Sequence, residues 1–137
     1  MSGVKLRCRK VVGGHGEGPA VLGRTRLSFW GGFDAGRGVI TERGSPLEGA
    51  QVAGTVLVFI SSKGSSEASR VMAAAKRNGK APAAIINTEV DAMVALACVA
   101  SGIPMVTDLE EDPFQRIRPG SRVEVNADEG YVLVEDG

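Results

Sequence analysis

The run TVLVFI at residues 55–60 is continuously apolar and rich in β-branched side chains. Such a run is typical of a strand that is covered on both faces, so it predicts a central strand of a sheet. After a short polar loop, Ala68, Val71, Met72 and Ala75 recur at the spacing of one helical face. A buried strand, a loop and an amphipathic helix in this order predict the first half of a parallel βαβ unit.

The same pattern continues further along the chain. Residues 83–87 (AAIIN) predict a second buried strand, and residues 91–101 predict an apolar helix that ends at Gly102. A third strand is expected at residues 104–107. Because crossovers between parallel strands are right-handed, we expect both helices to pack against one sheet.

Segments rich in turn residues at the two ends of the chain predict an antiparallel layer. We expect strands at residues 4–12, 19–22 and 26–30, a turn at 13–16, a long surface excursion at 36–47, one helical turn at 112–116, and a hairpin from 122–126 to 130–134. The predicted fold class is α/β: a β/β/α domain with a central parallel βαβαβ unit packed with an antiparallel β layer. A length of 137 residues suits a single domain over residues 1–137.

Charge and cysteine content exclude several classes of function. Sixteen basic residues balance sixteen acidic ones and aromatic residues make up 4%, so nucleic-acid binding is not expected. Cys8 and Cys98 belong to no metal or redox motif, so we expect this chain to hold no metal. The amino end is too charged for a signal peptide, and no apolar run approaches the ~18 residues that span a membrane. We therefore expect a cytoplasmic protein that does not act at a membrane.

The loop SSKGSSE at residues 61–67 carries the residues that suit a binding site. It leaves the carboxyl end of a buried strand and enters a helix, where open parallel sheets bind ligands. The helical N–H groups, the hydroxyls of Ser65 and Ser66 and the ammonium of Lys63 suit a carboxylate or phosphate, and Gly64 lets a ligand approach closely. From these residues alone, a flexible turn with a serine N-cap is the simpler interpretation.

Other catalytic classes lack the residues that they need. The phosphate-binding motif GxxxxGK is missing, and GxGxxG occurs at no strand-to-helix junction. His15 is the one histidine and lies in the predicted glycine turn, so a serine–histidine triad is not expected.

Four blocks of the sequence resemble, in order, the aconitase X swivelling-domain family: GRGVITERGSPLEGAQVAGTVLVF, SSKGSSEAS, NGKAPAAIIN and ASGIPMV. The resemblance runs nearly end to end. It implies a swivelling domain that closes over an iron-sulfur domain and presents a Gly-Ser-Ser loop, here Gly64-Ser65-Ser66. It implies that Ser65 is the proton acceptor and that Ser66 helps to bind substrate beside Gly64 and Lys63. Aconitase itself has an arginine where this chain has Glu67, so carboxylate binding by that arginine does not carry over.

The resemblance further implies a hydro-lyase that is active only as a heterodimer. A cluster needs several cysteine thiolates, so an iron-sulfur cluster of the 4Fe-4S type is expected on a large aconitase-like subunit. The expected substrate is a small anionic hydroxy acid, in the first place (R)-5-phosphomevalonate, dehydrated to trans-anhydromevalonate 5-phosphate in the archaeal mevalonate pathway. Two alternatives stay open: cis-3-hydroxy-L-proline as the substrate, and a non-catalytic swivelling module that binds or gates a ligand.

Overall fold

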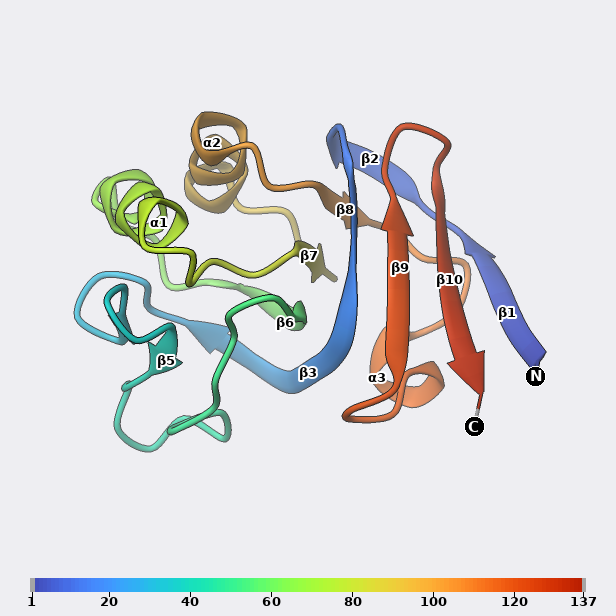
Figure 1. Ribbon diagram of the computed structural model, residues 1–137, viewed down its shortest axis with the longest axis horizontal. Helices are drawn as coiled ribbons and strands as arrows, with labels where there is room; N and C mark the ends of the chain where they lie inside the picture. Colours follow the sequence, from blue (N-terminus) through green and yellow to red (C-terminus); the bar gives the residue numbers. More distant parts are fainter. Residues whose placement is uncertain (1, 137) are drawn as a thin grey trace.

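Strand β3 (His15–Leu27) organises the fold because it takes part in both layers of the sheet. In the computed structural model, which describes residues 2–136, its first part pairs antiparallel with β9 (Arg122–Asn126). Its second part, from Ala20 onward, pairs parallel with β6 (Val56–Ser62). Figure 1 shows the bend that carries β3 from one layer into the other.

The parallel layer runs in the order β3, β6, β7 (Ala84–Asn87) and β8 (Met105–Thr107), with β2 (Arg9–Val12) antiparallel beside β8. The crossover helices α1 (Ala68–Arg77) and α2 (Ala92–Ser101) lie side by side over one face of this layer (Figure 1). This confirms the predicted parallel βαβαβ unit. It adds β3 as a fourth parallel strand, which glycines and arginines in its sequence concealed.

The antiparallel layer contains β1 (Ser2–Arg7), β10 (Tyr131–Asp136), β9 and the start of β3, which confirms the predicted hairpin. Strands β1 and β2 stand at the two ends of the strand order but are separated in the chain only by Cys8. The Cys8 N–H donates to the carbonyl of Gly130 at 3.0 Å. The layers are therefore joined on both sides, by β3 on one and by the β1–β2 connection on the other.

Two strand boundaries and one turn differ from the sequence-based prediction. Strand β3 is continuous from residue 15 to residue 27, so the separate strands expected at 19–22 and 26–30 are wrong, and so is the turn beyond Gly14. The reason is that pairing with β9 satisfies the backbone groups of His15 and Gly16 and overrides the turn preference of glycine.

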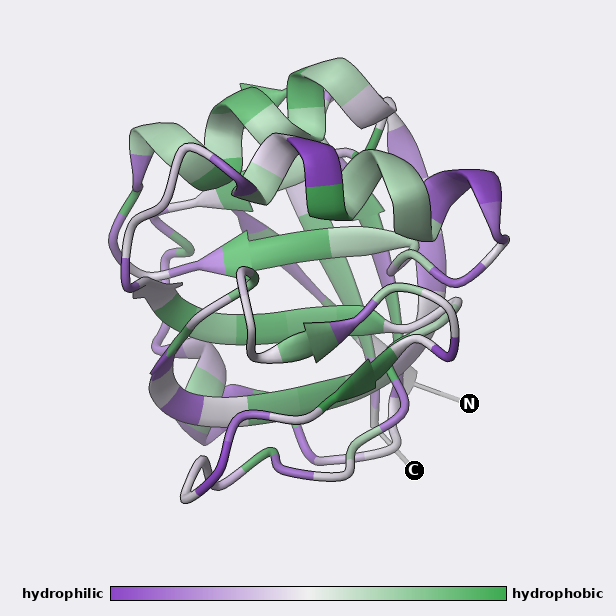
Figure 2. Cartoon of the chain, turned by 90° about the vertical axis from the view of Figure 1, so that its left-hand side faces the viewer, coloured by the Kyte–Doolittle hydropathy of each residue, from purple (hydrophilic) through white to green (hydrophobic). Residues whose placement is uncertain are grey.

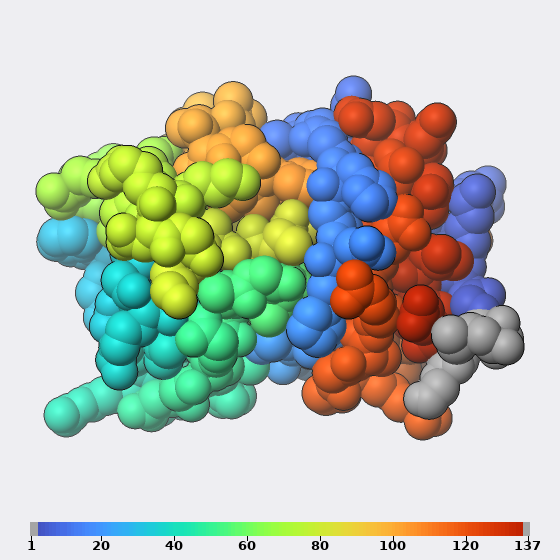
Figure 3. Space-filling view, in the orientation of Figure 1, coloured from blue at the N-terminus to red at the C-terminus, as the bar shows by residue number. Residues whose placement is uncertain are grey.

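The smaller elements follow the prediction more closely. The excursion at residues 36–47 is present and holds only the short β5 (Val39–Ile40), which pairs with β4 (Phe33–Asp34). The expected single helical turn is α3 (Pro113–Arg116). In Figure 3 the surface formed by β3 separates α1 and this excursion from β9 and β10.

Two apolar cores explain why β6 is apolar at successive positions. Leu57 and Phe59 face the core between the parallel layer and the helices, whereas Val56 and Val58 face the core between the two layers. Each fully buried side chain of this size stabilises the fold by roughly 1.5–3 kcal/mol. Figure 2 shows the hydrophobic strands stacked beneath the helices.

Both long helices end where the sequence predicts. Gly79 and Gly102 each adopt φ of 69° after the last turn of α1 and α2, a conformation that glycine adopts without strain. No helix within residues 2–136 has the length and hydropathy that a membrane span requires.

Gly18→Ala tests the close approach of β3 to the loop before β6. A Cβ at residue 18 would lie 2.2 Å from the carbonyl oxygen of Gly54, which is backbone and cannot rotate away. We expect this substitution to lower the free energy of unfolding, measured by urea denaturation, by roughly 1–3 kcal/mol. Gly3→Ala is the control, since its Cβ would meet Leu133 at an ordinary 3.4 Å. Equal losses in the two variants would contradict the explanation.

Candidate functional site

The carboxyl ends of four parallel strands meet at one edge of the sheet, which we call the carboxyl-terminal edge. Because β3, β6, β7 and β8 run parallel, the loops that follow them gather there, at residues 28–32, 63–67, 88–91 and 108–112. Open parallel sheets bind ligands at this edge. The Gly64-Ser65-Ser66 loop follows β6, so the loops after β3 and β7 flank it.

Ser62, the last residue of β6, fixes the start of this loop. Its Oγ accepts a hydrogen bond from the Gly64 N–H at 3.0 Å and donates to the carboxylate of Asp91. Asp91 also accepts from the Met93 N–H at 2.7 Å and thereby caps α2. Sequence reasoning missed Asp91 as a site residue. Its position before an apolar helix indicates a cap, but its contact with Ser62 depends on the sheet.

Ser65 stands where the chain turns into α1. Its Oγ accepts a hydrogen bond from the Glu67 N–H at 3.1 Å, and its carbonyl accepts from the Ala68 N–H at 3.2 Å. The structure corrects the predicted serine N-cap: the N-cap of α1 is Glu67, which makes no side-chain capping bond, and the Ser65 Oγ instead closes a tight turn before the helix. The regular helix therefore begins at Ala68 rather than at Ser65 or Ser66. An N–H donor and the positive end of a helix both favour negative charge on the Ser65 oxygen.

Lys63 forms an ion pair with Glu42, which comes from the excursion at residues 36–47. The same carboxylate accepts the Ser28 N–H at 2.8 Å. Burial opposes ionisation of Glu42, but the hydrogen bonds from Lys63 and Ser28 outweigh it and hold the pKa of this carboxyl below its ordinary value. Lys63 would therefore have to leave Glu42 in order to bind an anionic substrate.

Gly64 and Ser66 are exposed at the tip of the loop, and nothing lies within 4 Å of the position that a Gly64 Cβ would take. The next residue, Glu67, pairs with Arg70 one turn along α1. The guanidinium of Arg70 also lies 5.4 Å from the centre of the Trp30 ring. The negative charge of Glu67 is thus compensated, and it does not cancel the positive end of α1.

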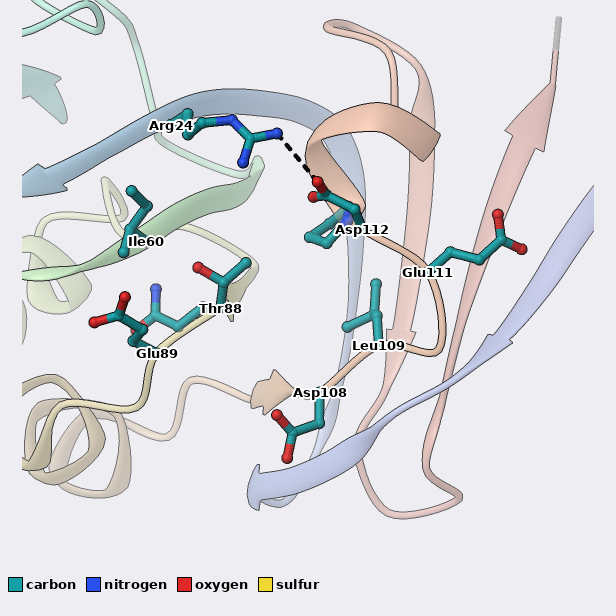
Figure 4. A pocket seen from close by; sticks show the side chains of 10 residues that line it. Arg24, Ile60, Thr88, Glu89, Asp108, Leu109, Glu111 and Asp112 are labelled. Carbon is teal, nitrogen blue, oxygen red and sulfur yellow. Dashed lines mark hydrogen bonds and ion pairs between the residues drawn. The ribbon is translucent and has the colours of Figure 1, made fainter.

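A cleft of about 420 Å³ opens at the same edge (Figure 4). Its lining comes from β3, from β6 and the end of β7, from the loops after β7 and β8, and from the start of α3. It includes Arg24, Thr88, Glu89, Asp108, Leu109 and Asp112. The carboxylates around it have arginine partners: Arg24–Asp112 at 3.1 Å, Arg26–Glu89 at 2.8 Å and Arg9–Asp108 at 2.8 Å. The hydrogen bond from Arg24 holds the pKa of Asp112 below its ordinary value. The cleft therefore has little free positive charge for an anion.

The cysteines of this chain do not fit an iron-sulfur cluster. Cys98 is buried against the core under the helices, and half-buried Cys8 packs against the other core. Burial raises the pKa of Cys8 to about 11 and that of Cys98 to about 12. Because the two thiols pack against different cores, they do not lie together as ligands of one cluster. Within residues 2–136, no three His, Cys, Asp or Glu side chains form a metal-binding group.

His15 does not belong to the site. It begins β3, at the opposite end of that strand from the carboxyl-terminal edge, and its Nε2 lies 2.7 Å from a carboxylate oxygen of Glu124 on β9. The structure thus corrects the predicted turn at His15 and gives Ser65 no histidine partner.

A β/β/α domain with an anchored serine loop at the carboxyl-terminal edge is a swivelling-type α/β domain. The model of the aconitase X swivel domain matches residues 5–134, and the chain belongs to this family.

Relatives match over nearly the whole chain. The phosphomevalonate dehydratase small subunit of Thermococcus gammatolerans is 45% identical over 134 residues, which cover 98% of this chain and 100% of the relative. The protein of the same name from Methanocella arvoryzae is 40% identical over 129 residues, covering 94% and 98%. The crystal structure of Thermococcus kodakaraensis aconitase X in its holo-form has 41% identity and a TM-score of 0.89, covering 97% of this chain and 99% of that chain. The predicted family and fold class are confirmed, and the names describe the first two relatives as parts of a heteromer.

Glu42→Gln tests the ion pair with Lys63. Because the folded pKa of Glu42 is lowered, its contribution to stability is complete above the ordinary glutamate pKa of about 4.3 and is lost as the pH falls through the lowered value. We expect urea to unfold Glu42→Gln more easily than wild type near neutral pH, with a difference that shrinks in acid. Lys63→Gln should lower the stability by a similar amount. The double variant should be only slightly less stable than either single variant, because both substitutions remove the same ion pair. A difference that is the same at every pH would contradict this account.

Proposed function

We propose that this chain is the small subunit of a phosphomevalonate dehydratase, a hydro-lyase that works with a larger aconitase-like subunit. The observation that carries the proposal is the similarity, over nearly the whole chain, to small subunits of that name. The substrate is then (R)-5-phosphomevalonate, and the products are trans-anhydromevalonate 5-phosphate and water.

Ser65 acts in this proposal as the base. It takes a proton from the carbon next to the one that bears the hydroxyl, the electron pair of the C–H bond forms the double bond, and the C–O bond breaks with its electron pair on the leaving hydroxyl. That hydroxyl takes up one proton and Ser65 later releases the one it took, so the net products are the alkene and one water. A serine oxygen is a poor base unless its negative charge is stabilised. The hydrogen bond from the Glu67 N–H and the start of α1 supply part of that stabilisation, which supports the assignment.

The neighbouring residues bind the substrate. Ser66 offers an exposed hydroxyl, and the open space at Gly64 lets the substrate approach the backbone. Lys63 exchanges the carboxylate of Glu42 for an anionic group of the substrate. The charge of Glu42 is then left with the Ser28 N–H, so this exchange has a cost that a doubly charged phosphate offsets better than a single carboxylate.

The iron-sulfur cluster belongs, in this proposal, to the larger subunit. The support is that a cluster needs several cysteine ligands, whereas the two thiols of this chain pack against different cores.

Ser65→Ala is the direct test. The complex is assembled from both subunits, its cluster is reconstituted without oxygen, and dehydration of 5-phosphomevalonate is followed. We expect kcat to fall by about 10²- to 10⁴-fold, the usual contribution of a general base, with assembly unchanged. Ser69→Ala, a serine within the first turn of α1, is the matched control and should keep its activity. Full activity of Ser65→Ala would eliminate this serine as the base.

The same complex tests the choice of substrate. We expect turnover of 5-phosphomevalonate and none of cis-3-hydroxy-L-proline. The opposite result would assign the chain to a hydroxyproline dehydratase, and turnover of neither by a complex with an intact cluster would favour the non-catalytic swivelling module.

A further inference from the structure

A buried hydroxyl stands at the base of the serine loop, Gly64-Ser65-Ser66. Only 8% of Ser62 is exposed, and a hydroxyl taken out of water costs free energy unless it finds hydrogen-bond partners. The Ser62 oxygen has two partners, since it donates to the Asp91 carboxylate and accepts from the Gly64 N–H at 3.0 Å. The serine loop is therefore joined to the start of α2 through this side chain.

Asp91 sets the direction of both hydrogen bonds. Its carboxylate also accepts from the Met93 N–H at 2.7 Å, so it acts as an acceptor toward both neighbours. The Ser62 hydroxyl has a single hydrogen, which is used on Asp91. The lone pairs of the Ser62 oxygen remain, and these accept the N–H of Gly64.

The sheet holds Asp91 in place independently of the serine loop. Asp91 is the N-cap of α2, which lies beside α1 over the parallel layer (Figure 1). In the same connection, the Glu89 N–H donates to the carbonyl of Ile60 on β6 at 2.9 Å. The loop after β7 is thus attached to the end of β6, and this attachment keeps Asp91 within reach of Ser62.

Gly64 is the residue that depends on this contact. It adopts a φ of 81°, and glycine can leave such a conformation for many others. Packing does not restrain it, because nothing lies within 4 Å of the position that its Cβ would take. The hydrogen bond to Ser62 therefore restrains Gly64, and the next residue, Ser65, begins the turn in which its oxygen meets the Glu67 N–H.

We propose that Asp91 is a positioning residue for the serine base and that it acts through Ser62. Its carboxylate orients the Ser62 hydroxyl, the Ser62 oxygen holds the Gly64 N–H, and the direction in which the chain leaves β6 then places Ser65 against the substrate. The inference rests on the proposed function, in which Ser65 is the base. Asp91 touches no reacting atom, so its effect is confined to the placement of the Ser65 oxygen.

Three substitutions separate this role from the cap of α2. Ser62→Ala removes the hydroxyl and leaves the cap. Asp91→Ser keeps an oxygen that can cap the Met93 N–H, but its side chain is too short to reach Ser62. Asp91→Ala removes both contacts. Stability should follow the cap, so urea should unfold Asp91→Ala at a lower concentration than Asp91→Ser.

Activity should instead follow the contact with Ser62. In the reconstituted complex, kcat should fall by about 10-fold or more in all three variants, whereas KM should change by less than about twofold. With Ser65→Ala as the background, Asp91→Ser should lower the residual activity by less than about twofold, because the residue that it positions is already gone. A general loss of structure would lower both activities by the same factor.

A second readout needs no turnover. Amide hydrogen exchange of the full ¹⁵N-labelled chain reports on the Gly64 N–H directly. Its exchange rate should rise by about 2- to 10-fold in Ser62→Ala and in Asp91→Ser, the ratio that corresponds to one hydrogen bond. The amides within β6 are the internal control and should exchange as in the wild type.

Three outcomes would overturn the positioning role: wild-type kcat in Ser62→Ala and Asp91→Ser, an equal loss in the Ser65→Ala background, or an unchanged exchange rate of the Gly64 N–H. Failure of the proposed function looks different. A wild-type complex that dehydrates nothing removes the function, while the exchange rate still decides whether Asp91 and Ser62 restrain the loop. A complex that requires Ser65 but tolerates Asp91→Ser and Ser62→Ala keeps the function and removes the positioning role.

Discussion

Burial of β6 on both faces is the constraint on which the rest of the structure depends. Its alternate side chains fill two different cores. A shift of the strand by one residue would therefore move every one of its side chains into the other core. Its neighbours β3 and β7 complete the centre of the sheet. The loop that leaves β6 is therefore carried by a strand that is packed on both faces, which suits the proposed placement of Ser65 against a substrate.

The serine loop is exposed, yet three contacts hold it to three different elements. Ser62 binds Asp91 at the start of α2, Lys63 binds the Glu42 carboxylate of the surface excursion, and Glu67 binds Arg70 on α1. Two of these contacts are ion pairs, in which the charges of Lys63 and Glu67 are compensated by Glu42 and Arg70. The site of the isolated chain is accordingly close to neutral, and the N–H groups and hydroxyls at the start of α1 are what remain for an anion.

In the proposed function, this chain contributes one half of an active site. It positions a serine oxygen against an N–H donor, but its two thiols pack against different cores, and no three potential ligand side chains gather within residues 2–136.

The sequence alone determined the features that depend on neighbours along the chain. Periodicity and stop signals defined β6, α1, β7 and α2, because helix faces and caps are set by residues within a few positions of one another. The ordered blocks identified the family, whereas the expected serine cap of α1 is replaced by a tight turn that Ser65 closes before the helix. Tertiary structure decided the path of β3, whose backbone groups are satisfied by β9 and β6 rather than by a turn. It also decided the partners of Lys63 and Ser62, which lie 21 and 29 residues away in the chain and come together only through the order of the strands.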